Sequence, residues 1–118
     1  MEPRILYEDK YLLVVDKPAG MVVNRAESVK GETVEDWLAS NFQFSIFNFQ
    51  LMRHGVVHRI DKETSGVLLV AKTPEVFENL QAQFKERGVQ KSYVALVHGK
   101  VMPEEGVINV PIGRLPWN

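Results

Sequence analysis

Short apolar segments, separated by glycine, proline and polar residues, are the feature that most limits what this chain can fold into. None of them approaches the roughly 18 to 20 apolar residues of a membrane span. Segments of this length that are rich in valine, isoleucine and aromatic residues are typical of β-strands. The predicted strands are residues 4–7, 11–16, 21–24, 55–57, 67–71, 91–98 and 107–110.

Two other segments have the apolar spacing of amphipathic helices. Thr33 is a predicted N-cap, and apolar residues then recur at helical spacing over 34–42, a helix of about ten residues. The second helix is predicted to begin at Thr73 and Pro74, because a capping hydroxyl followed by proline favours a helix start. Gly88 is its predicted left-handed end.

These elements together predict an α+β fold with a mostly antiparallel or mixed β-sheet and two amphipathic helices. A proline and a glycine predict a turn over 17–20, and the polar stretch 25–32 predicts a loop. The phenylalanine-rich stretch 42–49 has no clear period, so we expect a packed aromatic loop or a second short helix there.

Composition excludes several classes of protein. The chain has 45% hydrophobic and 25% charged residues, which is typical of a globular domain. It has no cysteine, and therefore no disulfide framework and no thiol nucleophile. We expect a cytoplasmic protein with no membrane contact. A net charge of −1 argues against gripping nucleic acid by bulk charge, although residues 53–100 carry 8 basic and 5 acidic side chains.

The densest chemistry lies in residues 54–66, between two apolar segments. A metal site built from His54, His58 and Asp61 is disfavoured, because two histidines four positions apart on a strand stand about 13 Å apart. A kinase-like interpretation of the His-Arg-Ile-Asp stretch fails, because the chain has neither the glycine-rich loop nor the Asp-Phe-Gly of that family.

Two interpretations of this segment stay open from the residues alone. In one, Asp61 caps a turn or pairs with Arg59, and the polar residues 64–66 hydrogen-bond the loop backbone. In the other, Asp61 is a nucleophile or a general base whose charged form is favoured by Arg59 and Lys62.

Residues 55–72 resemble the signature of the RluA-type family of pseudouridine synthases. The family core reads His-Arg-Leu-Asp-x-x-Thr-Ser-Gly, and this chain departs from it only at Ile60. Three flanking stretches resemble the family in the same order, so the resemblance covers nearly the whole chain. They are residues 14–23, 91–99 and 106–114.

The resemblance implies that Asp61 is the catalytic aspartate, which attacks the ribose of a flipped-out uridine or otherwise starts cleavage of its glycosidic bond. It implies no cofactor and no metal. Tyr93 matches the tyrosine that packs against the target base, and Arg59 matches an arginine that holds the RNA with the nucleotide extruded. Residues that would shape the substrate loop are Thr64, Ser65 and Gly66. Candidates for contact with RNA phosphates are Lys62, Lys72, Lys85, Arg87 and Lys91.

The resemblance also sets expectations for domains and partners. We expect residues 1–118 to be the N-terminal portion of a catalytic domain, without the C-terminal portion that completes the uracil pocket and without an S4-type domain. The expected partner is a structured tRNA or rRNA, with no obligatory protein partner. The leading hypothesis is an RNA uridine isomerase. The alternatives are a non-catalytic RNA-binding module or an inactive fragment, and a plain α+β domain.

Overall fold

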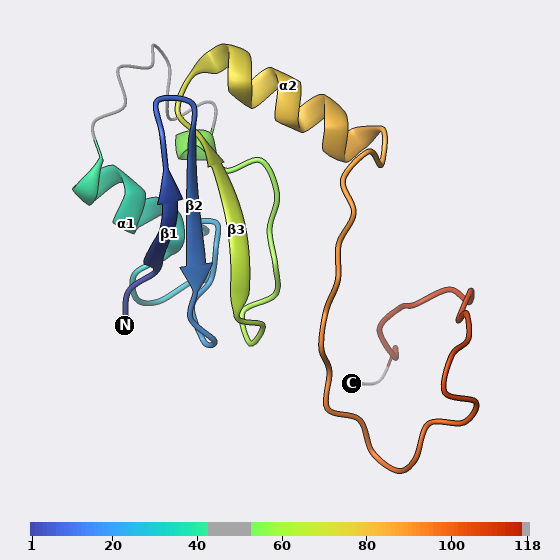
Figure 1. The fold of residues 1–118 in the computed structure, drawn as a ribbon. Helices are drawn as coiled ribbons and strands as arrows, with labels where there is room; N and C mark the ends of the chain where they lie inside the picture. Colours follow the sequence, from blue (N-terminus) through green and yellow to red (C-terminus); the bar gives the residue numbers. More distant parts are fainter. Residues whose placement is uncertain (43–52, 117–118) are drawn as a thin grey trace.

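The protein is described by a computed structural model that covers residues 1–42 and 53–116. Its centre is one antiparallel sheet of three strands in the order β1-β2-β3 (Figure 1). The strands are β1 (Arg4–Glu8), β2 (Leu12–Lys17) and β3 (Gly66–Ala71). Two α-helices, α1 (Val34–Asn41) and α2 (Pro74–Lys85), and a short 3₁₀ turn, η1 (Arg53–Gly55), complete the described elements. The predicted α+β class is confirmed.

The hydrophobic core lies between one face of the sheet and α1. Inward-facing residues of β2 and β3 pack there with α1 and with the segment after β2. They are Leu13, Val15, Leu68, Val70, Val34, Trp37, Leu38, Met21, Val23 and Val56. The buried positions of β2 alternate, as the two-residue period of a strand requires. β1 is exposed along its whole length, so the core rests on β2 and β3.

Both predicted helix starts are confirmed. The Thr33 hydroxyl accepts the Asp36 amide at 3.2 Å, and the Asp36 carboxylate accepts the Thr33 amide at 2.9 Å, which forms a capping box. The Thr73 hydroxyl likewise caps α2, with Pro74 at its first position. The first helix is shorter than predicted, with 8 residues, because Phe42 already has an extended backbone.

The end of α2 differs from the prediction. Arg87, not Gly88, takes the left-handed conformation, with φ of 59°. The Gly88 amide donates to the Gln83 carbonyl at 2.8 Å and the Arg87 amide to the Phe84 carbonyl at 3.2 Å, the pattern of a Schellman motif. The left-handed residue therefore comes one position earlier than the glycine suggests, and an arginine carries the unfavourable backbone angle.

The predicted strand at 21–24 does not form. Met21 and Val23 are buried, but the carbonyls of Val22 and Val23 accept the amides of Val34 and Glu35 at the start of α1. The first amides of a helix have no partner within the helix, and the carbonyls of this segment accept two of them. Likewise, 55–57 contributes a single bridge, between Val56 and Val70, rather than a strand.

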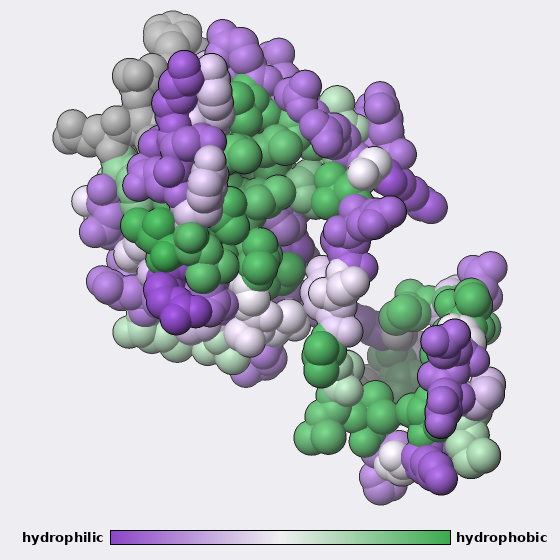
Figure 2. All heavy atoms as spheres, viewed as in Figure 1, coloured by the Kyte–Doolittle hydropathy of each residue, from purple (hydrophilic) through white to green (hydrophobic). Residues whose placement is uncertain are grey.

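The predicted strands 91–98 and 107–110 are wrong as well. The chain beyond α2 runs away from the sheet without regular structure as far as residue 116 (Figure 1). Its apolar side chains are exposed, and Figure 2 shows them as a separate group beside the folded body. A strand forms only when a neighbour takes up its amides and carbonyls, and the described residues give this segment none. Of the stretch 42–49, all but Phe42 lies outside the described residues.

No helix in the part of the chain that the structure describes has the length and apolarity needed to cross a membrane. Within residues 1–42 and 53–116, no three histidine, aspartate or glutamate side chains converge as metal ligands would.

Candidate active site

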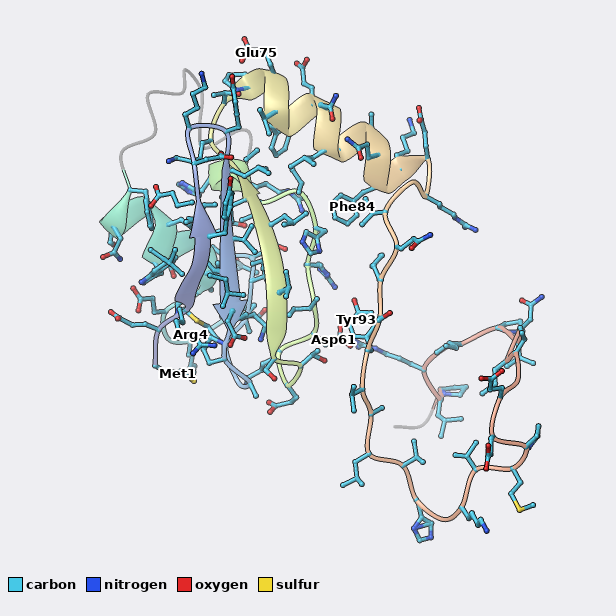
Figure 3. All side chains as sticks on the ribbon, viewed as in Figure 1. Met1, Arg4, Asp61, Glu75, Phe84 and Tyr93 are labelled. Atoms are coloured by element: carbon cyan, nitrogen blue, oxygen red, sulfur yellow. The ribbon has the colours of Figure 1, made fainter. Side chains whose placement is uncertain are left out.

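The loop that carries Asp61 leads from the bridge at Val56 to the start of β3, at one end of the sheet (Figure 3). The Asp61 side chain is exposed, and its backbone carbonyl accepts the Thr64 amide at 3.0 Å, which closes a tight turn. The carboxylate is therefore open to solvent while the backbone beneath it is held by a hydrogen bond. A reactive side chain on a fixed loop is a common arrangement in binding and catalytic sites.

A buried lysine fixes this loop from below. Lys17, the last residue of β2, has no solvent exposure, and its ammonium donates to three carbonyls: Pro18 at 2.9 Å, Met21 at 2.7 Å and Lys62 at 2.9 Å. The Gly20 amide donates to the same Lys62 carbonyl at 2.7 Å. The backbone next to Asp61 is thus joined at two points to the turn that follows β2.

The charge of Lys17 belongs to this arrangement. Burial lowers the pKa of Lys17, and the carboxylates of Glu63 and Asp61 act in the opposite direction. Three carbonyl acceptors match the three donors of an ammonium, so the buried charge has its full set of partners. A single side chain therefore connects the sheet, the turn and the loop, and brings a positive charge close enough to interact with Asp61.

His58 attaches the other end of the loop to the sheet. Its Nε2 accepts a hydrogen bond from the Leu69 amide of β3 at 2.9 Å. The imidazole thus takes the place of the carbonyl that a neighbouring strand would provide. The imidazole stacks on Phe84 of α2, with ring centroids 4.5 Å apart. Burial, and secondarily the charge of Lys91, lower the pKa of His58. The ring is therefore held neutral, as an acceptor must be.

The predicted site residues divide between two cavities. Tyr93 and the residues of 64–66 line one of about 550 Å³, together with Lys91 and Phe84. Asp61 lies in another, of about 240 Å³. Its further walls include Arg59 and Lys62. Asp61 and Tyr93 thus line different cavities, and the two cavities adjoin at Ile60, which lines both.

Lys72 lies in neither cavity. Its ammonium is 2.7 Å from the Glu8 carboxylate and donates to the Asp9 carbonyl at 2.7 Å, beside the turn between β1 and β2. This end of the sheet is remote from the loop, since Lys72 follows the last residue of β3 and Asp61 precedes the first. The predicted contact of Lys72 with RNA therefore has no support from the geometry around Asp61.

The comparisons with known proteins agree with the motif. The sequence model of the RNA pseudouridylate synthase family matches residues 11–115. The chain belongs to this family.

Named relatives are similar over almost the whole chain. An uncharacterised RNA pseudouridine synthase of Bacillus subtilis is 44% identical over 115 residues, which is 97% of this chain and 38% of the relative. The ribosomal large subunit pseudouridine synthase D of Nitrosomonas europaea is 43% identical over 114 residues, or 96% of this chain and 32% of the relative. The chain spans about a third of the length of these relatives.

A solved structure supports the fold of this family member. Human RNA pseudouridylate synthase domain containing 4 matches with a TM-score of 0.51 and 30% identity, over 72% of this chain and 30% of that one. The sheet and its helices are therefore those of a pseudouridylate synthase domain.

Lys17 is the residue of this synthase domain that sequence reasoning misses, because residues 17–20 are predicted as a turn. The alternation of inward-facing and outward-facing positions along β2 could have identified it. Leu13 and Val15 face the core, and position 17 is the next one on the same face. A lysine at an inward position must find partners, and this one finds two in the segment after β2 and the third in the backbone of the Asp61 loop.

Proposed function

We propose that the complete protein isomerises uridine in RNA to pseudouridine, with Asp61 as the catalytic residue. Membership of the pseudouridylate synthase family supports the reaction. The observation that carries the assignment to Asp61 is the exposed carboxylate on a loop whose neighbouring carbonyl is held by a buried lysine and a backbone amide. These hydrogen bonds fix the backbone that carries the carboxylate, and nucleophilic catalysis requires such positioning.

The proposed reaction rearranges one nucleotide and consumes no second substrate. The bond between C1′ of the ribose and N1 of uracil breaks after Asp61 acts on the nucleotide. The freed uracil turns and forms a new bond from C5 to C1′. The hydrogen of C5 leaves to solvent as a proton, and N1 gains a proton, so atoms and electrons balance without an oxidant or reductant.

The target uridine must leave its base stack to reach Asp61, and extrusion costs a few kcal/mol that the pocket offsets by stacking and hydrogen bonds. Tyr93 and residues 64–66 share a cavity large enough for a base, about 550 Å³. We assign Tyr93 to the face of the base and residues 64–66 to the shape of the loop. Arg59 lines the cavity of about 240 Å³ together with Asp61, where it would hold the RNA backbone. Lys62 and Lys91 remain proposed phosphate contacts.

Large-subunit ribosomal RNA is the proposed substrate class. Similar relatives bear the names ribosomal large subunit pseudouridine synthase D and C. The proposal extends to this protein the RNA that those names state, with tRNA as the second pool to test. We place the activity in the cytoplasm, where such RNA is available.

The test is tritium release from RNA labelled at C5 of uracil, since C5 loses its hydrogen only when a new bond forms there. The complete protein is expected to release tritium from unmodified large-subunit rRNA. Asp61→Asn is expected to lower the rate at least about 1,000-fold, as loss of a nucleophile does. Glu63→Gln is the matched control, because Glu63 is an exposed carboxylate two positions away on the same loop. It should release tritium within a few-fold of the parent.

Equal losses in the two variants would overturn the assignment of Asp61. Tight RNA binding with no release from either rRNA or tRNA would replace the enzyme with a non-catalytic RNA-binding module, in which Asp61→Asn binds RNA as well as the parent does.

A further inference from the structure

The cavity beside Asp61 has a neighbour with which it shares two lining residues. The first has a volume of about 240 Å³ and the second about 450 Å³, and Asn24 and Arg59 line both. We call the two together the trough. Asp61 and Lys62 lie in its first cavity, and Arg53 and Gln81 lie in its second.

The trough concentrates positive charge in a chain whose net charge is −1. Among the described residues, its charged lining consists of Arg53, Arg59 and Lys62 against the carboxylate of Asp61, a balance of +2. In the same described ranges, the cavity lined by Tyr93 has Lys91 as its one formally charged residue. An anion that approaches Asp61 therefore meets more favourable charge along the trough than on the other side of the loop.

The two arginines of the trough are not neutralised by the protein. Arg4 and Arg25 pair with Asp16 and Asp36. By contrast, neither Arg53 nor Arg59 makes an ion pair with any residue in the described ranges, and both are exposed. An unpaired guanidinium offers a planar set of donors that matches a phosphate group.

The backbone under Arg53 is tightly fixed. Residues 53, 54 and 55 all have positive φ, of 51°, 55° and 85°. Two of them are not glycine and carry the cost of that conformation. Gly55 is pressed against β3, where a Cβ would come within 2.1 Å of the Ala71 carbonyl oxygen. Arg53 is therefore presented two residues before the point where the backbone lies against β3.

We propose that the trough binds the phosphodiester backbone of RNA and that Arg53 is a phosphate contact outside the target nucleotide. The proposal rests on the proposed function, because it names the path of the same RNA. Eight positions separate Arg53 from Asp61, and an extended chain of that length spans at most about 26 Å, so one RNA segment can reach both. The two residues line different cavities of the trough. The phosphate at Arg53 therefore belongs to a neighbouring nucleotide, which supplies affinity but takes no part in the chemistry.

The test is the salt dependence of RNA binding, measured with the complete protein and in vitro transcribed large-subunit rRNA. Each phosphate contact that is lost reduces the slope of log K against log salt concentration by about 0.7 to 0.9. We expect Arg53→Gln to lose one such unit and to bind about tenfold more weakly at moderate salt. Arg53→Lys should keep the slope, since it keeps the charge. Arg4→Gln, the same change on exposed β1, is the control and should leave the slope unchanged.

Tritium release then separates this proposal from the proposed function. Arg53→Gln should raise KM and leave kcat close to the parent value, because the contact is remote from the bond that breaks. An unchanged slope and KM in Arg53→Gln, in a parent that releases tritium, would overturn the trough and leave the enzyme intact. If Arg53→Gln reduces the slope but the parent protein never releases tritium, the trough is supported and the proposed enzymatic function is overturned. If Arg53→Gln acted through a folding defect, its thermal unfolding temperature would change, and Arg53→Lys would not specifically restore RNA binding.

Discussion

β2 and the segment 91–98 have the same kind of sequence but different structures. Both are rich in β-branched and apolar residues. In β2, Leu13 and Val15 are fully buried between neighbouring strands and α1, whereas Val94 and Leu96 are fully exposed. The difference shows that an apolar, β-branched segment becomes a strand with a buried face only when a partner is present. β2 has strands on both sides, and 91–98 has none among the described residues.

The largest difference between the two segments is expected from the same truncation made in the sheet and in 91–98. Leu68→Ala removes a fully buried side chain from β3 and should lower the free energy of unfolding by about 2 to 5 kcal/mol. Leu96→Ala removes a fully exposed one and should change it by less than about 0.5 kcal/mol. Urea unfolding of the 118-residue chain measures both. Similar losses in the two variants would mean that 91–98 is packed in solution as β2 is.

A second pair compares two glycines that share a left-handed backbone. Gly55→Ala should cost about 2 to 3 kcal/mol, because the new Cβ meets the Ala71 carbonyl in addition to the strain of positive φ. Gly31→Ala has φ of 87° but open space around it, so only the backbone strain of about 1 kcal/mol should remain. Thermal unfolding of both variants checks the difference, and equal costs would contradict the close approach of η1 to β3.

A smaller effect is expected at His58, which contacts Leu69 of β3 and Phe84 of α2. The folded-state pKa of His58 lies below its ordinary value of 6.5, so the unfolded chain binds the proton more readily. The stability from neutral His58 is therefore complete above pH 6.5 and is lost as the pH falls toward the folded-state pKa. His58→Gln keeps a neutral acceptor and should flatten the slope of stability against pH over this window, which urea unfolding at a series of pH values measures.

The smallest effect on the slope of stability against pH is expected from a change at Lys91. It lies over the Phe84 ring, 5.8 Å from the centroid, and its charge helps to lower the pKa of His58. In Lys91→Gln the folded-state pKa of His58 should rise toward the unfolded value, so stability should fall less steeply as the pH drops below 6.5. A slope identical to that of the parent would show that the segment after α2 does not lie beside this helix in solution.

Prediction from sequence works where the cause is local. Thr33 and Thr73 are identifiable as caps because a hydroxyl needs only the amides of the following turn. It fails where the partner is distant in the chain. Met21 and Val23 are buried as strand residues would be, but their segment pairs with the first turn of α1. The end of α2 is a local exception, because Arg87 adopts the left-handed angle one position before Gly88.

For the candidate site, the amino-acid sequence alone specifies which residue types stand together. The motif around Asp61 is enough to indicate the family, since its residues are contiguous in 55–72. How these residues are held depends on the packing of the folded chain. This packing places Lys17 beneath the loop, 45 positions away from the Lys62 carbonyl that it binds, and joins Arg53 to Arg59 along one trough. Such contacts depend on how the strands and turns pack, because a buried charge takes whichever backbone carbonyls the fold brings within reach.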